Sequence, residues 1–190
     1  VDDFLGKRII NKYNNLSLKV IVPSQSLGGS LNKDKDHMES NIKLGYLDTM
    51  KAYKRYDGVK YFFNLDCKYN EDYCFKKISS LSEDTINDLC YLLNIKKEVS
   101  RRVLMENIVP KIIDILELDK DSSYKDIFYS IYERKLEENN INRIELYDFN
   151  KVVQLCNEQM TEDKLQVNHS ISKLAKIITN LIIYDFNKQK

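Results

Sequence analysis

The side chains of this chain that could carry out acid-base or metal chemistry are few and scattered. His37 and His169 are the only histidines, and neither has a cysteine or an acidic residue at metal-site or catalytic-triad spacing. The pair Glu137 and Glu138 lies in a stretch of mixed charge, which is typical of a solvated face rather than of catalytic carboxylates. We find no nucleophile motif. The sequence therefore predicts surface or capping histidines, no catalytic residue, no cofactor and no enzyme activity in this segment.

Four cysteines are the other reactive side chains. Cys67, Cys74, Cys90 and Cys156 do not form a close metal-binding pair, and the last two fall on apolar faces of predicted helices. This pattern indicates free thiols in a reducing compartment, so we expect a cytoplasmic protein. A disulfide between Cys67 and Cys74 is the alternative if the chain is secreted.

The composition favours a helical protein whose net charge is too small to produce a strong electrostatic field. The chain has 190 residues, is 43% hydrophobic, and contains only five glycines and two prolines, which favours long helices over a β-sandwich. Thirty basic residues nearly balance 29 acidic ones, so charge does not indicate nucleic acid or a membrane as partner. No apolar run is long enough to span a bilayer. Because the chain begins at Val1 without Met, we expect a fragment of a larger protein.

The middle of the chain contains two similar helix-loop-helix patterns. Apolar residues recur at helical spacing after each loop, and the second set repeats the first at a shift of 40 residues. The helices that lead into the loops are amphipathic as well. The first set is Leu104, Val109, Ile112, Ile113 and Leu116, and the second is Ile144, Phe149, Val152, Val153 and Cys156. The leading helices carry Ile86, Leu89, Cys90 and Leu93, and Tyr124, Ile127, Phe128 and Ile131.

Residues 82–160 resemble the EF-hand family, in which paired helix-loop-helix units hold an apolar residue at the eighth position of a twelve-residue loop. The same periodicity is also typical of ordinary antiparallel helix hairpins in a bundle. With Ile144 at the eighth position, the resemblance implies Glu137, Asn139, Glu145 and Asp148 as calcium ligands.

Both loops depart from a calcium-binding pattern. Ile141 stands where a ligand oxygen is needed and Asn142 stands where glycine makes the sharp turn. The first loop contains four cations, which repel calcium. They are Lys96, Lys97, Arg101 and Arg102. We therefore expect weak calcium binding at best, no resident metal, and units that are structural or hold a partner helix.

The amino-terminal part is predicted to be an arm. Residues 3–13 have enough apolar positions for a short helix, residues 16–22 alternate as in an edge strand or extended arm, and residues 24–36 have the composition of a flexible linker. We therefore expect an amino-terminal arm and linker over residues 1–36 and a helical domain over residues 37–190.

Several further elements follow from local signals. A helix over residues 38–56 places its apolar residues at helical spacing, and we expect them to pack against the helix pairs. The aromatic run over residues 59–65 predicts a buried strand or another helical turn. Ser82 and the polar connector 119–123 are helix-start signals, and Pro110 predicts a break near Asn107. The apolar residues of the helix over 38–56 are Ile42, Tyr46, Leu47, Met50 and Tyr53.

The last predicted helix spans residues 161–187 and has a wide apolar stripe. Such a stripe is either buried in the core or receives a partner. The stripe consists of Leu165, Ile171, Leu174, Ile178 and Leu181. We interpret the chain as an all-α, calcium-independent scaffold domain for protein-protein interaction, with a helix or peptide as partner and this stripe as the binding surface.

Two other functions remain open at this point. One is a calcium-responsive regulatory module of an attached enzyme, acting through the loop that ends at Asp148. The other is a helical domain associated with nucleic acid, acting through Arg101 and Arg102 with the lysines around them. The balanced charge disfavours the second, and no pattern indicates a small-molecule ligand.

Overall fold

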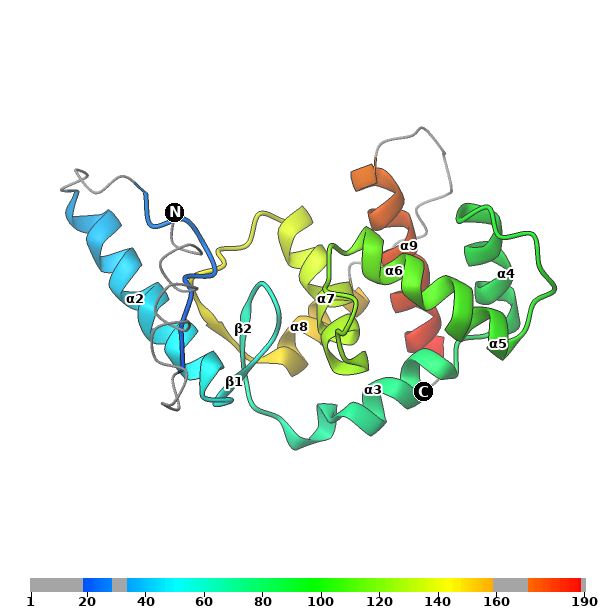
Figure 1. The fold of residues 1–190 in the computed structure, drawn as a ribbon, viewed down its shortest axis with the longest axis horizontal. Coiled ribbons are helices and arrows are strands. Elements are labelled where there is room, and N and C mark those ends of the chain that lie inside the picture. Colours follow the sequence, from blue (N-terminus) through cyan, green and yellow to red (C-terminus); the bar gives the residue numbers. More distant parts are fainter. Residues whose placement is uncertain (1–18, 29–33, 159–170, 189–190) are drawn as a thin grey trace, which may run out of the picture. The chain divides into compact units, whose positions relative to one another are not determined.

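The computed structural model describes residues 19–28, 34–158 and 171–188, and it divides into two units (Figure 1). Unit 1 consists of Val1–Leu65 with Arg143–Leu146, and unit 2 of Asp66–Asn142 with Tyr147–Lys190. The division falls elsewhere than the boundary expected after residue 36, because Leu44, Phe62 and Ile144 share one apolar core. The helix expected over residues 3–13 lies outside the described residues. The described residues are mainly helical, which confirms the helical class, and a small sheet adds to it.

Unit 1 is built from one long helix and a small sheet. Helix α2 (Lys35–Ala52) begins inside the stretch expected to be linker. Strands β1 (Tyr56–Asp57) and β2 (Phe62–Asn64) pair antiparallel, with Tyr56 opposite Asn64, and β3 (Leu146–Tyr147) completes the order β1-β2-β3. The turn between β1 and β2 contains Gly58 at φ +99°, a conformation that side chains disfavour. The aromatic run over residues 59–65 contains β2, in which Phe62 and Phe63 are buried. A buried strand is one of the two forms that the sequence of this run predicts.

Unit 2 is a bundle of helices in which α9 packs against α4, α7 and α8 (Figure 1). The first turn, η1 (Cys67–Tyr69), leads into α3, which packs against α7. None of the described helices combines the length and apolar character that a membrane span requires. The remaining elements are α3 (Glu71–Ser79), α4 (Glu83–Leu92), α5 (Arg101–Val103), η2 (Leu104–Ile108), α6 (Val109–Ile115), α7 (Tyr124–Glu138), α8 (Phe149–Glu158) and α9 (Ile171–Lys188).

Pro110 changes the hydrogen bonding of the helix formed by α5, η2 and α6. Proline has no N–H and its ring crowds the carbonyl four residues earlier, so a regular helix is strained there. The chain responds with a π-helical turn over Leu104–Ile108, in which the Val109 N–H donates to the Leu104 carbonyl five residues back. The break predicted near Asn107 is thus confirmed as a local change of winding.

Side chains cap the helices of unit 2 at their amino ends. The Ser82 hydroxyl accepts from the Thr85 N–H at the start of α4, and Ser123 and Asp126 form a reciprocal capping box on α7. Both predicted helix starts are confirmed. A distant residue adds to the second, because the Glu71 carboxylate of α3 accepts from the N–H groups of Tyr124 and Lys125 at 2.8 and 3.0 Å. This contact joins α3 to the positive end of α7.

Aromatic rings form the centre of unit 2. The ring of Phe149, which is 1% exposed, lies 4.2 Å from Tyr129, 4.9 Å from Tyr69 and 5.4 Å from Tyr132 between centroids. The Tyr69 hydroxyl donates to the Asn150 side chain at 2.8 Å, so the one polar atom of its ring is satisfied. Tyr69 and Phe149 therefore lie inside the core of unit 2.

Burial of Tyr69 makes the free energy of unfolding depend on pH in the alkaline range. Desolvation, with the nearby carboxylates of Asp66 and Asp148, raises the pKa of Tyr69 from 10.0 to about 12. The folded state therefore holds the phenol proton more tightly than the unfolded state. This contribution is complete below pH 10 and is lost as pH rises from 10 toward 12.

We expect Tyr69→Phe to flatten the fall in unfolding free energy between pH 10 and 12. Urea titrations at a series of pH values measure this slope for the variant and the parent. Tyr132, whose pKa burial also raises, leaves part of the slope in place. Equal slopes for variant and parent would contradict the assignment.

All four cysteines are free. Cys74, Cys90 and Cys156 are buried, whereas Cys67 is exposed, so the alternative of a bridge between Cys67 and Cys74 is wrong for this structure. Burial raises the pKa of the Cys156 thiol to about 11 and also raises that of Cys90. Since the thiolate is the reactive form, these thiols are suited to packing rather than to nucleophilic chemistry.

Candidate functional site

Helix α2 uses one face to hold unit 1 together. Leu44 and Leu47 are buried and pack with Phe62 of β2, and Tyr56 and Ile144 border this cluster. The Lys51 ammonium lies 4.3 Å from the Phe62 ring centroid and donates to the Val59 carbonyl. This packed face accounts for the stability of α2 in its unit.

The opposite face of α2 is apolar and exposed. Met38, Ile42 and Tyr46 follow each other at intervals of four residues, so they form one ridge along the helix. Their exposed fractions are 53, 72 and 56%. At 3.6 residues per turn, Ile42 points nearly opposite to Leu44. We call the surface of Met38, Ile42 and Tyr46, with Gly45 between them, the outer face of α2.

The sequence correctly predicts this helix but not the direction of its side chains. Of the residues expected to pack inward, Leu47 is buried, whereas Ile42, Tyr46 and Tyr53 are exposed, so that expectation is wrong for three of them. The reason is that α2 is apolar on two sides and only one side has a core to meet. The sequence does show two apolar rows on this helix, and this pattern indicates that one row can remain exposed.

An extended arm runs along the flank of α2. The Ser24 N–H donates to the Asp48 carboxylate at 2.9 Å, and the side chains of His37 and Asn41 contact the Leu27 carbonyl at 2.8 and 3.0 Å. Residues 19–28 thus run along α2 without regular secondary structure, and His37 helps to fasten them through Leu27. The other histidine, His169, lies outside the described residues.

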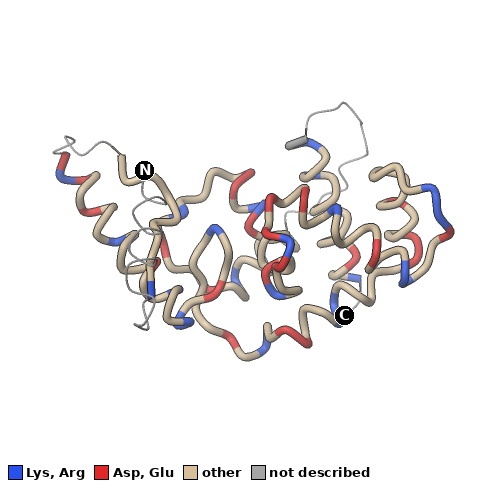
Figure 2. The backbone as a smooth tube through the Cα atoms, viewed as in Figure 1, with Lys and Arg blue, Asp and Glu red and all other residues tan. Residues whose placement is uncertain are grey.

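The outer face has a mixed border of aromatic hydroxyls and charges. The hydroxyl groups of Tyr46 and Tyr56 lie 3.5 Å apart, and this hydrogen bond, with some desolvation, raises the pKa of Tyr56. Lys35 and Glu39 pair at 3.6 Å on the same helix. Positions of both charge signs are interspersed along the described backbone (Figure 2). The outer face is thus suited to apolar contact with polar edges.

The described side chains of the stripe predicted on the last helix are buried or half-buried. Ile178 is 1% exposed and packs in the core of unit 2, and Leu174 and Leu181 are half-buried. Leu165 lies outside the described residues, and only the backbone of Ile171 is described. None of the three described side chains of the stripe is exposed. Core packing accounts for the described part of the stripe.

The side chains expected around a calcium ion have other neighbours. Among the described residues, no three His, Cys, Asp or Glu side chains gather closely enough to hold a metal ion. Asn139 ends α7, and the Asp148 carboxylate accepts from the Asn150 N–H at the start of α8. Glu137 pairs with Arg134 at 3.0 Å, and Glu145 pairs with Lys43.

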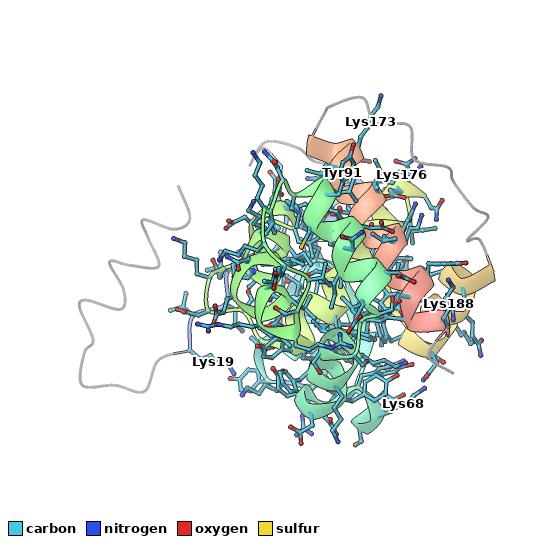
Figure 3. The ribbon with its side chains drawn as sticks, turned by 90° about the vertical axis from the view of Figure 1, so that its right-hand side faces the viewer. Lys19, Lys68, Tyr91, Lys173, Lys176 and Lys188 are labelled. Atoms are coloured by element: carbon cyan, nitrogen blue, oxygen red, sulfur yellow. The ribbon has the colours of Figure 1, made fainter. Side chains whose placement is uncertain are left out.

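The two arginines considered for nucleic acid are also engaged. Arg101 donates to the Leu81 carbonyl, and Arg102 pairs with Glu106 at 2.9 Å. Figure 3 shows Tyr91 of α4 and Lys173 and Lys176 of α9 at the surface of unit 2. Tyr91 is 82% exposed, and no other large apolar side chain of α4 (Glu83–Leu92) is exposed.

Comparison with family models, with curated proteins and with solved structures gives no match for this chain. The resemblance of residues 82–160 to EF-hands therefore stays a prediction from the hydrophobic pattern.

Proposed function

We propose that this chain is a non-catalytic helical module that binds another protein through the outer face of α2. The observation that carries the proposal is the row of Met38, Ile42 and Tyr46, apolar side chains at least half exposed along one helix. Exposed apolar rows with polar borders are typical of interaction surfaces. The proposal keeps the interaction function expected from the sequence and moves its surface from the last helix to α2.

The spacing of the row defines the kind of partner. Residues four apart form a ridge that fits the groove between equivalent ridges of a second helix. Tyr46 offers an aromatic body with a polar hydroxyl, which suits it as an anchor in such a contact. We therefore infer that the partner is an amphipathic helix with apolar residues at intervals of three or four.

Replacement of Ile42 by Asp tests this function. The side chain is exposed, so the charge should leave the melting temperature nearly unchanged while it disrupts apolar docking. We expect proteins captured from a cell extract by the parent chain to be lost with Ile42→Asp. A purified candidate should then bind the parent and bind the variant at least about tenfold more weakly, as expected for loss of a central contact.

Tyr91→Asp is the matched control. It places the same charge at an exposed apolar residue of unit 2 and should capture the same proteins as the parent. If Ile42→Asp and the parent also capture the same proteins with equal affinity, the outer face of α2 is not the binding surface.

A further inference from the structure

The exposed charges of α4 all have one sign. Glu83, Asp84 and Asp88 are exposed on this helix, and its sequence contains no lysine or arginine. The other side of the helix is buried, since Ile86 and Leu89 lie in the core of unit 2. Helix α4 therefore carries a row of carboxylates on the outside of its unit. We call these three side chains the acidic row.

The exposed charges of α9 have the opposite sign. Lys173, Lys176 and Lys188 are exposed along this helix, and Figure 3 shows them at the surface of unit 2. Asp185 is the one acidic residue in the sequence of α9, and it is buried and accepts hydrogen bonds from α4. We call the three lysines the basic row.

The acidic row and the basic row are neighbours on one unit. Helix α4 packs against α9, and the contacts of Ser82 and Thr85 with Asp185 place the start of α4 beside the end of α9. Figure 3 shows Tyr91, near the end of α4, toward the same end of the unit as Lys176, so the two helices run antiparallel. Among the residues that the structure describes, no ion pair joins one row to the other. Both rows thus remain available to a partner.

A surface with an acidic row beside a basic row is complementary to itself. If a second copy faces the first across a two-fold axis parallel to the helices, α4 of each copy lies on α9 of the other. The acidic row then meets the basic row twice. With the axis across the helices, α4 would meet α4, and like charges would repel. Charge therefore selects the first arrangement.

We propose that two copies of this chain associate face to face through α4 and α9, with each acidic row on the basic row of the other copy. An axis parallel to the helices keeps every residue at its own level, so the contact between α4 and Asp185 sets the register. Asp88 of one copy then lies within about 7 Å, measured along the helix axis, of Lys176 of the other. A lysine side chain can span this rise.

The proposed dimer is weak and sensitive to salt. Each exposed ion pair contributes little, and salt screens it. The inference is independent of the proposed function, because α4 and α9 belong to unit 2 whereas α2 belongs to unit 1.

Exchange of charge between two variants tests the contact. Sedimentation equilibrium of the full chain should show a monomer and a dimer, with association about tenfold weaker in ~500 mM than in ~20 mM NaCl. Asp88→Lys and Lys176→Glu should each weaken association at least about tenfold, because symmetry makes like charges meet twice. An equimolar mixture of the two variants should dimerise within about threefold of the parent, since every charge again meets its opposite.

Ile42→Asp is the matched control, because it changes an exposed residue of unit 1 and should leave the dimer in place. The charge variants change exposed residues, so their melting temperatures in dilute solution should match that of the parent. A parent that stays monomeric at low salt, or a mixture no tighter than its separate variants, would overturn the inference. So would assemblies larger than a dimer, or a dimer lost with Ile42→Asp but kept with Asp88→Lys. Loss of partner capture by Ile42→Asp would support the proposed function in each of these cases.

Discussion

Phe149→Ala is expected to lower the free energy of unfolding by about 4 kcal/mol, the cost of removing a fully buried ring from a packed core. Phe149 lies at the start of α8 and touches the rings of Tyr69, Tyr129 and Tyr132. These rings come from two other segments, so the cavity opens where the elements meet and cannot be closed by one side chain. Urea unfolding followed by circular dichroism measures the loss.

Phe75→Ala is the matched control for this core. Its ring is partly exposed and contacts Tyr124 at 4.9 Å between centroids. We expect a loss of about 1 kcal/mol for this pair of rings at the surface. If both variants lost the same stability, the aromatic centre around Phe149 would not be the main core of unit 2.

Asp185→Ala is expected to cost about 3 kcal/mol of unfolding free energy, because it removes the acceptor of several charge-assisted hydrogen bonds. Asp185 of α9 is 2% exposed, and its carboxylate accepts from the Ser82 N–H at 3.1 Å, the Ser82 hydroxyl, and the Thr85 hydroxyl at 2.9 Å. The substitution leaves donors at the amino end of α4 without their acceptor. Thermal and urea unfolding of the variant measure the cost.

Two further variants separate the charge from the hydrogen bonds. Asp185→Asn keeps one acceptor oxygen and the size of the side chain, so it should lose less stability than Asp185→Ala. Asp88→Ala removes an exposed carboxylate from α4 and should change stability by less than about 0.5 kcal/mol. A loss for Asp185→Ala no larger than that for Asp88→Ala would show that the contact with α4 contributes nothing.

These two core variants act on unit 2, whereas the proposed binding surface belongs to unit 1. Variants of the outer face of α2 should therefore change binding with little effect on the fold, and variants at Phe149 and Asp185 should do the reverse. This separation makes the interaction proposal testable, because a loss of partner capture by Ile42→Asp cannot be attributed to unfolding when the melting temperature is unchanged.

The sequence by itself determined the local features of this protein. Ser82 and Ser123 mark helix starts because a cap needs only a hydroxyl and an N–H three residues away. Pro110 disturbs the helix because of its own ring, whatever surrounds it. The helical class follows from the same local signals, repeated along the chain.

Only the tertiary structure decided which apolar face of each helix is covered. The sequence predicts burial equally for Ile42 and Leu47. In the structure β2 packs against the side of α2 that carries Leu47, and Ile42 is left exposed. The stripe around Ile178 reads as a binding surface until α4 and α7 are seen packed against α9. Likewise Asp185 meets Ser82 across 103 residues of chain. Periodicity shows that a face is apolar, whereas burial depends on which distant element arrives to cover it.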